Sequence, residues 1–194
     1  MSAPPDSHIK VIGVGGAGGS VINRLIAEGV RGLDLLVVDT ALPGLLHSKA
    51  KLRVQLGRNL LNGLGTGGEI EQGKIAAEAS TDDLLEMVRA TDTICLVAGM
   101  GGGTGGGASP VIARVAREHD AKIIGVVSRP FTFEGNWRQR AAEQSIARLR
   151  DQVDHLIEFD NNRLLRLAGK TPDQQRVFDL AAGVLAWQVI THVV

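Results

Sequence analysis

Glycines gathered in three short clusters are the residues whose type and spacing point most directly to chemistry. Of the 25 glycines among 194 residues, five lie between positions 13 and 19, five between 63 and 73, and seven between 99 and 107. Backbone N–H groups converge on an anion only where no side chain blocks close approach, and glycine meets this need. The first and third clusters therefore predict two loops that hold the phosphates of a nucleotide from two sides.

Two other interpretations of these glycines remain open. They could serve only tight turns and close packing, which is a reasonable account of one cluster and a weak one for residues 101–107. Alternatively, Gly13, Gly15 and Gly18 spell the G-x-G-x-x-G of a dinucleotide-binding turn. Asp39 then ends the next apolar run, at about the 20-residue spacing where such a site places an acidic residue. The dinucleotide-binding motif leaves the glycine cluster at 99–107 without a role. The ordinary P-loop enzymes are disfavoured too, because no lysine follows the glycines as in a Walker loop.

The first and third glycine clusters each follow a strand-like segment and precede a helix-like one. Residues 8–14 predict a strand before the first cluster, and residues 20–28 repeat apolar side chains at helical spacing after it. Residues 93–98 predict a strand before the third cluster, and Ser109-Pro110 is expected to open a helix because proline suits the first helical position. Further strands are expected over 33–38, 52–56, 122–128 and 155–159, and further helices over 69–79, 82–90, 135–152 and from 172 to the end, with Thr81 and Thr171 as N-caps.

Short apolar strands alternating with longer amphipathic helices predict an α/β fold, a Rossmann-like, mostly parallel sheet with helices on both faces. The length suits one domain, and a composition that is 44% hydrophobic and 22% charged excludes a disordered chain. With 21 basic and 21 acidic side chains, no nucleic-acid partner is expected. Residues 93–113 carry no charge, but seven glycines and one proline argue against a membrane helix, so no membrane insertion is expected.

Cys95 is the one cysteine of the sequence and lies in the apolar run 94–97. There is accordingly no disulfide framework or zinc motif, and a buried, inert thiol is expected. The first residues have neither the basic start nor the apolar stretch of a signal peptide. We therefore expect a cytoplasmic protein with a flexible tail over residues 1–8 and a nucleotide-binding domain over residues 9–194.

The sequence GGGTGGG at residues 101–107 resembles the glycine-rich loop of the tubulin and FtsZ family. The similarity to bacterial FtsZ extends from IKVIGVGG at 9–16 through AGM at 98–100 and RPFTFEG at 129–135 to the last helix. Members of this family bind GTP with magnesium, polymerise head to tail, and hydrolyse GTP when an acidic loop of the next subunit completes the site. The resemblance therefore implies GTP or GDP as ligand, Mg²⁺ with the triphosphate, and association with itself or another FtsZ-like subunit.

The resemblance also implies which residues bind the nucleotide. Glu134 would bind the ribose, Arg138 would lie beside the nucleotide, Phe178 would stack on guanine and Asn161 would hydrogen-bond the base. The alternatives are a solvated charge for Glu134 and Arg138, and core packing for Phe178. The full implied set is Gly15, Gly16, Ala17, Gly18, Gly19, Ser20, Gly67, Gly68, Met100, Gly101, Gly102, Gly103, Thr104, Gly105, Gly106, Pro130, Glu134, Arg138, Asn161 and Phe178.

Several positions depart from the FtsZ pattern. Near the phosphates, Ser20 replaces an asparagine, Ala41 a carboxylate and Glu69 an asparagine, and Glu69 adds a like charge beside the γ-phosphate. These changes act against triphosphate affinity. After Phe178, Ala182-Gly183 replaces a pair of Asp or Asn residues, so guanine discrimination is expected to fall.

The sequence ends at Val194, within what is the long central helix of FtsZ, before the acidic loop and the second domain. We therefore expect negligible hydrolysis by the chain alone. Residues 180–194 carry no Asp, Glu, Lys or Arg, which predicts self-association or docking through this apolar helix. Two other functions stay open: a nucleotide-independent modulator or cap of FtsZ-type filaments, and a dinucleotide-binding Rossmann protein.

Overall fold

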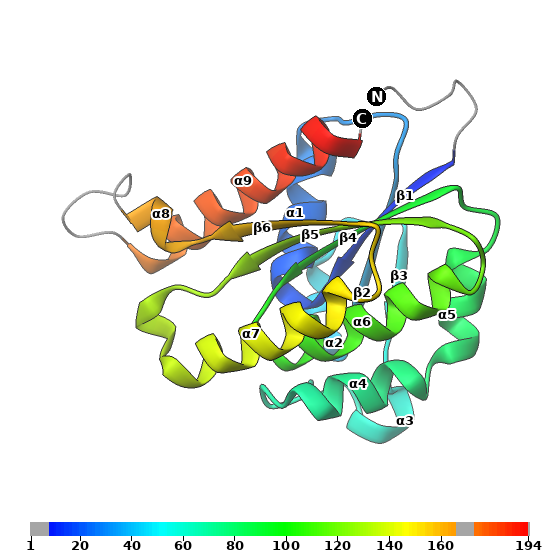
Figure 1. Ribbon diagram of the computed structural model, residues 1–194, viewed down its shortest axis with the longest axis horizontal. Coiled ribbons are helices and arrows are strands. Elements are labelled where there is room, and N and C mark those ends of the chain that lie inside the picture. The colour runs from blue at the N-terminus through cyan, green and yellow to red at the C-terminus, as the bar shows by residue number, and fades with distance from the viewer. Residues whose placement is uncertain (1–7, 166–172, 194) are drawn as a thin grey trace.

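One parallel sheet organises the computed structural model, which describes residues 8–165 and 173–193. Its order is β3-β2-β1-β4-β5-β6, and every neighbouring pair is parallel (Figure 1). This order is that of a doubly wound sheet, so the predicted Rossmann-like α/β fold is confirmed. The strands are β1 (Ile9–Val14), β2 (Asp34–Asp39), β3 (Leu52–Gln55), β4 (Thr93–Gly99), β5 (Lys122–Arg129) and β6 (His155–Asp160).

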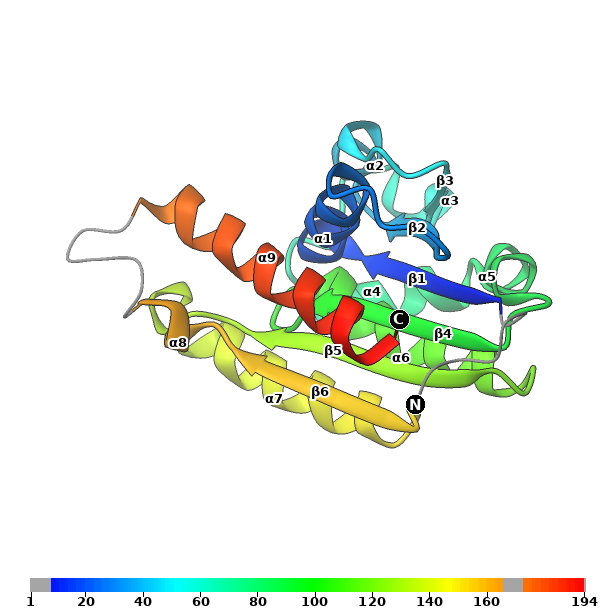
Figure 2. The same ribbon diagram turned by 90° about the horizontal axis from the view of Figure 1, so that it is seen from above.

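Helices cover both faces of the sheet. Helices α1, α2 and α9 lie on one face, and α4 to α7 lie on the other (Figure 2). The described helices are α1 (Gly15–Ala27), α2 (Leu42–His47), α3 (Arg58–Leu61), α4 (Ile70–Glu78), α5 (Thr81–Val88), α6 (Gly103–Arg117), α7 (Asn136–Arg150), α8 (Asn162–Leu165), α9 (Gln174–Val193) and the 3₁₀ helix η1 (Thr132–Glu134).

The central strands supply a core on each side because successive side chains of a strand point to opposite faces. On β1, Ile12 belongs to the core beneath α4–α7 and Val11 to the core beneath α1 and α9. On β4, Cys95 is fully buried, and burial raises the pKa of its thiol to about 12. The expected buried thiol is confirmed. These buried runs explain why the apolar strands were recognisable in the sequence.

Two helices begin earlier than the sequence predicts. Helix α1 starts at Gly15 rather than at Ser20, so its first turn is built from the glycine cluster. Helix α6 starts at Gly103, which places Pro110 inside the helix and not at its first position. Glycine has a low helix propensity. Tertiary packing overrides that propensity at both positions.

The packing is a close contact of α4 with α6. A Cβ on Gly73 would lie less than 3.0 Å from the carbonyl of Gly103, and one on Gly107 would lie as close to the carbonyl of Ile70. The glycine half of α6 therefore lies against the backbone of α4. Close packing, the alternative interpretation of the third cluster, accounts for this part of it.

The predicted helix caps and the short helices differ from the sequence-based expectations. Thr81 was expected to cap a helix from outside, but it is the first residue of α5, and its hydroxyl donates to the Glu78 carbonyl at 2.6 Å. Helices α2, α3, α8 and η1 were not predicted, because elements of three to six residues show no helical period. The N-cap expected at Thr171, residues 1–7 of the expected tail and Val194 lie outside the described residues.

Candidate functional site

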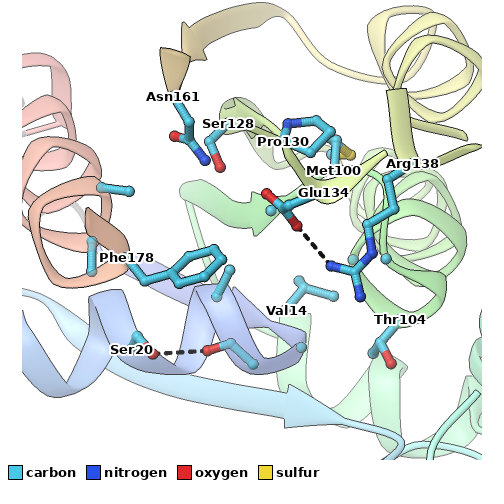
Figure 3. A pocket seen from close by; sticks show the side chains of 18 of the residues that line it. Val14, Ser20, Met100, Thr104, Ser128, Pro130, Glu134, Arg138, Asn161 and Phe178 are labelled. Carbon is cyan, nitrogen blue, oxygen red and sulfur yellow. Dashed lines mark hydrogen bonds and ion pairs between the residues drawn. The ribbon is translucent and has the colours of Figure 1, made fainter. Parts of the chain in front are cut away.

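A cavity of about 510 Å³ opens at the carboxyl ends of the central strands, the place where doubly wound sheets bind ligands. Val14, Gly99 and Ser128, which lie at or beside the ends of β1, β4 and β5, form its floor. The first turns of α1 and α6 lie along one part of it, and α9 closes the other (Figure 3). Strand order thus brings both glycine loops to one cavity.

The N-termini of α1 and α6 face this cavity with free donors. Val14 and Gly102 are their N-cap residues, and neither offers a side-chain cap within the described part of the chain. A Cβ on Gly16 or Gly102 would meet no described atom within 4 Å, so the backbone is open to a ligand at both places. Two helix dipoles and two sets of unpaired N–H groups make this end of the cavity an anion site.

A hydrogen bond links the first turn of α6 to the residue that follows β2, one strand beyond β1 in the sheet. The hydroxyls of Thr40 and Thr104 lie 2.6 Å apart. Asp39, just before Thr40, does not line the main cavity; it borders a smaller hollow of about 240 Å³. Its Oδ1 accepts from the Ala41 N–H at 3.1 Å, and the residue is 4% exposed. Asp39 therefore has a structural role, which does not favour the ribose contact that a dinucleotide-binding turn requires.

Glu134 and Arg138 form an ion pair in the middle of the cavity. The Glu134 Oε2 atom accepts from Arg138 Nη1 at 2.7 Å, and Oε1 accepts from the Phe131 N–H at 2.8 Å. The Arg138 side chain extends toward Thr104 (Figure 3). The pair adds no net charge, so the attraction for an anion comes from the helix N-termini.

Aromatic side chains gather at the opposite end of the cavity. Phe178 of α9 contacts Phe131 edge to face with ring centroids 5.4 Å apart, and Phe133 at 6.3 Å. Phe178 remains 37% exposed and lines the cavity. Its ring is therefore held by two neighbours while part of it stays open to a flat ligand.

Asn161 follows β6 and lies near the aromatic end of the cavity (Figure 3). It is 5% exposed, and its Oδ1 atom has no hydrogen-bond partner among the described residues. Most buried polar atoms in proteins are paired, so the unpaired Oδ1 atom leaves the carboxamide of Asn161 without a hydrogen bond that fixes its orientation through this atom.

The structure brings most of the sequence-predicted site residues to this cavity. Those lining it are Gly15, Gly16, Ala17, Ser20, Gly68, Met100, Gly102, Gly103, Thr104, Gly105, Pro130, Glu134, Arg138, Asn161 and Phe178. The others lie outside the lining. Gly18 and Gly101 are packed against the backbone of β4 and α7, Gly19 borders the smaller hollow, Gly106 borders a groove between α4, α6 and α7, and Gly67 is exposed.

Some lining residues were missed as site residues. The ends of the predicted strands could have indicated Val14, Gly99 and Ser128. Helical spacing from Phe178 could have indicated the lining residues of α9. Thr66 lies in the second glycine cluster, beside Gly67 and Gly68, and that cluster was the signal for it; no pattern indicated Gln175. Ala182, where the resemblance implies the loss of a base contact, does line the cavity. The missed lining residues are Val14, Thr66, Gly99, Ser128, Gln175, Ala181 and Leu185.

The described residues hold neither a cluster of metal-ligating side chains nor a membrane-spanning helix. Across residues 8–165 and 173–193, no three His, Cys, Asp or Glu side chains are placed to share a metal ion. Over those ranges, too, no helix has the length and apolar character to cross a bilayer.

A doubly wound parallel sheet with two glycine-rich helix N-termini at its carboxyl edge defines a class of nucleotide-binding α/β proteins. Within that class, the model of the Tubulin/FtsZ family, GTPase domain, matches residues 8–169. The chain belongs to this cytoskeletal family, and the resemblance found in the sequence is confirmed.

Solved structures of the family support the assignment. The empty FtsZ dimer of M. jannaschii is 32% identical with a TM-score of 0.90, over 93% of this chain and 52% of that one. CetZ2 from Haloferax volcanii, a GTPγS-bound protofilament, is 27% identical with a TM-score of 0.82, over 94% and 57%. CetZ1 from the same organism, a GDP-bound monomer, is 27% identical with a TM-score of 0.81, over 94% of this chain and 59% of that one. The chain thus spans somewhat more than half the length of these relatives.

Proposed function

We propose that the cavity binds GTP or GDP, with the phosphates between the N-termini of α1 and α6 and the base beside Phe178. The observation that carries this proposal is the convergence of two uncapped helix N-termini on one cavity. The volume of about 510 Å³ suits a nucleotide. Mg²⁺ would enter with the triphosphate, because this ion is commonly held by substrate phosphates and few protein ligands.

The remaining lining residues take roles along the same line. Glu134, in the middle of the cavity, would accept hydrogen bonds from the ribose hydroxyls with its remaining lone pairs. Arg138 has donors beyond the one given to Glu134, and these would approach the phosphates from the side of Thr104. The positions of Glu134 and Arg138 in the lining support these proposed roles.

Nucleotide titration by calorimetry tests the proposal. The protein is expected to bind GTP and GDP, and Thr104→Arg is expected to abolish binding, because the long side chain fills the space between the two loops. Thr191→Arg makes the same exchange at an exposed position near the end of α9 and serves as the matched control. Absence of heat and of a thermal shift with the unaltered protein at millimolar GTP and GDP would falsify the binding claim.

Hydrolysis by this site would depend on a second protein. Glu134 is the one carboxylate among the described lining residues, and both of its oxygens already accept hydrogen bonds. A water attacking the γ-phosphate needs a catalytic base or a polar side chain to orient it, and in the FtsZ family an acidic loop of the next subunit has this role. We accordingly expect phosphate release to be negligible with this chain alone and to rise when an FtsZ-like protein carrying an acidic loop is added.

Self-association is the second part of the proposed function. The FtsZ of M. jannaschii is described as a dimer and CetZ2 as a protofilament. In this chain, Leu180 and Trp187 on the outer side of α9 are exposed, and a groove of about 490 Å³ lies between α9 and α1 beside them. We propose this surface for contact with another FtsZ-like subunit in a cytoskeletal filament of cell division. Association without nucleotide binding would instead fit a filament cap or modulator.

A further inference from the structure

The end of the cavity nearest Phe178 offers a ligand polar groups that carry no charge. Ser128, Asn161 and Gln175 supply them. Glu134 is the one carboxylate lining the described cavity, and it is engaged at the middle by its own hydrogen bonds. A base that enters this end therefore meets hydroxyl and carboxamide side chains and apolar ones, and no acidic side chain of the described lining.

We infer that this end of the cavity accepts adenine as well as guanine, so that the chain binds purine nucleotides with little preference between GTP and ATP. The inference rests on the nucleotide site proposed above and adds its substrate class. Its main support is the lining beside Phe178, where Asn161 supplies a carboxamide and no acidic side chain is present among the described residues. The Asn161 Oδ1 atom has no partner in the described structure, so a rotation that turns it toward the cavity breaks no hydrogen bond of that atom.

The carboxamide of Asn161 suits either purine. It combines one acceptor with an amino donor, and a rotation of 180° about χ2 exchanges their positions. Guanine presents its O6 acceptor next to the N1–H donor, whereas adenine presents its N6 amino donor next to the N1 acceptor. One rotamer matches guanine and the other matches adenine, so this side chain makes no choice between them.

The cavity wall beside Phe178 also does not discriminate between guanine and adenine. Ala182 lies four residues after Phe178, on the same side of α9, and lines the cavity with a methyl group. A carboxylate at this position would accept from the N1–H and amino groups of guanine and would face the bare N1 acceptor of adenine. Discrimination of this kind arises from leaving a polar group unpaired with the wrong ligand, and a methyl group imposes no such penalty.

Stacking on Phe178 adds affinity without selectivity between purines. The ring is oriented by Phe131 and Phe133, at centroid distances of 5.4 and 6.3 Å. An aromatic face accepts any base, because every base has a π-face. The aromatic end therefore favours purines for their area and is indifferent to their substituents.

Competition against a fluorescent GTP analogue, using the whole chain, tests the inference. GTP and ATP are expected to have dissociation constants within about tenfold of each other. A site that rejects one base by hydrogen bonding separates the two constants much further. CTP is expected to bind more weakly than both. A preference for GTP over ATP beyond about tenfold overturns the inference and leaves the nucleotide site intact. Equal competition by CTP also overturns it, whereas failure of GTP and ATP alike overturns the proposed function instead.

Variants at the cavity wall sharpen the test. Ala182→Asp is expected to raise the preference for GTP over ATP by about tenfold or more, the scale of one bidentate base contact. Asn161→Asp preserves the size of the side chain and is expected to weaken GTP and ATP alike, because one carboxylate oxygen would face O6 of guanine or N1 of adenine. Gly183→Asp adds the same charge one residue along from Ala182, in the groove beside Arg24, and is the control expected to leave the ratio unchanged. An unchanged ratio in Ala182→Asp, shown to be folded by circular dichroism, overturns the inference.

Discussion

Asp39 is a carboxylate held inside the protein at the end of β2, with 4% of its surface exposed. Burial raises the pKa of this carboxyl above its ordinary value, and hydrogen bonds from the Ala41 and Thr40 backbone and from Thr104 offset part of the rise. The folded protein therefore binds this proton more tightly than the unfolded chain does. The resulting stability is full below the ordinary pKa and is lost as pH rises through the raised pKa.

Asp39→Asn is expected to raise the melting temperature at pH 7, because it removes a buried charge and retains the Oδ1 acceptor for the Ala41 N–H. The gain should shrink as the pH is lowered toward 4, because the raised pKa lets the carboxyl of the parent protein take up its proton at a higher pH than an ordinary carboxyl does. Thermal melts at both pH values measure this. Asp34→Asn, at the exposed start of the same strand, controls for the change in net charge. A gain of equal size at both pH values would contradict the argument.

At the scale of single residues, glycine spacing located the glycine-rich end of the cavity but not which glycines line it, since Gly18, Gly19, Gly67, Gly101 and Gly106 lie outside the lining. The residues at the middle and the aromatic end were predicted from the family resemblance, and Glu134, Arg138 and Phe178 line the cavity. Gln175 was missed because a single polar residue in the first turn of a helix carries no pattern. The lack of a partner for Asn161 Oδ1 is a property of the folded environment and cannot be read from residue types.

At the scale of elements, the approach of α4 to α6 positions the second glycine loop. Gly73 of α4 lies against the carbonyl of Gly103, the first residue of α6. A side chain on α4 at this position would push away the turn that faces the cavity. The same contact explains why glycine is found within two helices despite its propensity.

Gly73→Ala is expected to lower the free energy of unfolding by about 1–3 kcal/mol, the usual cost of overpacking, and to weaken nucleotide binding by displacing the loop. Gly183→Ala is the matched control, since only the Arg24 guanidinium lies near its added Cβ, at 3.8 Å. It should raise the stability by up to about 1 kcal/mol through helix propensity. Urea denaturation of both variants measures the difference. Equal effects in the two helices would show that the α4–α6 contact is not tight.

The sequence predicted every strand and the longer helices, because buried apolar runs and helical periods are local signals. The starts of α1 and α6 were wrong. Both helices begin within glycine clusters whose helical state depends on packing against distant backbone, such as Gly18 against the Val97 carbonyl. Such contacts join segments far apart along the chain and leave no local pattern.

At the scale of the whole molecule, α9 buries one side and exposes the other. Val177, Leu185 and Val189 face the protein interior, whereas Trp187 is 59% exposed. An indole at the edge of an apolar groove gains free energy when a partner covers it. This arrangement supports the proposed association surface.

Trp187→Glu is expected to reduce self-association at least about tenfold, the scale of a modest interface anchor, in sedimentation experiments over a range of concentrations. Leu60→Glu, at an exposed position of α3 distant in the chain, is the control expected to leave the oligomeric state unchanged. In a Trp137→Phe background, the Trp187 emission should shift to shorter wavelength as the concentration rises. A monomer at every concentration would rule out the surface.

The pairing of β1 with β4 has a consequence for synthesis on the ribosome. Ile9 pairs with Thr93, so residues 15–92 must all be synthesised before β4, the second strand that pairs with β1, can be made. Helix α1 begins where β1 ends and α6 follows β4, so the two phosphate loops meet only after this long-range contact forms. Contacts between distant segments form slowly. A nascent chain therefore carries its first glycine loop long before the cavity that we propose for nucleotide can form, and the cavity is completed late in folding.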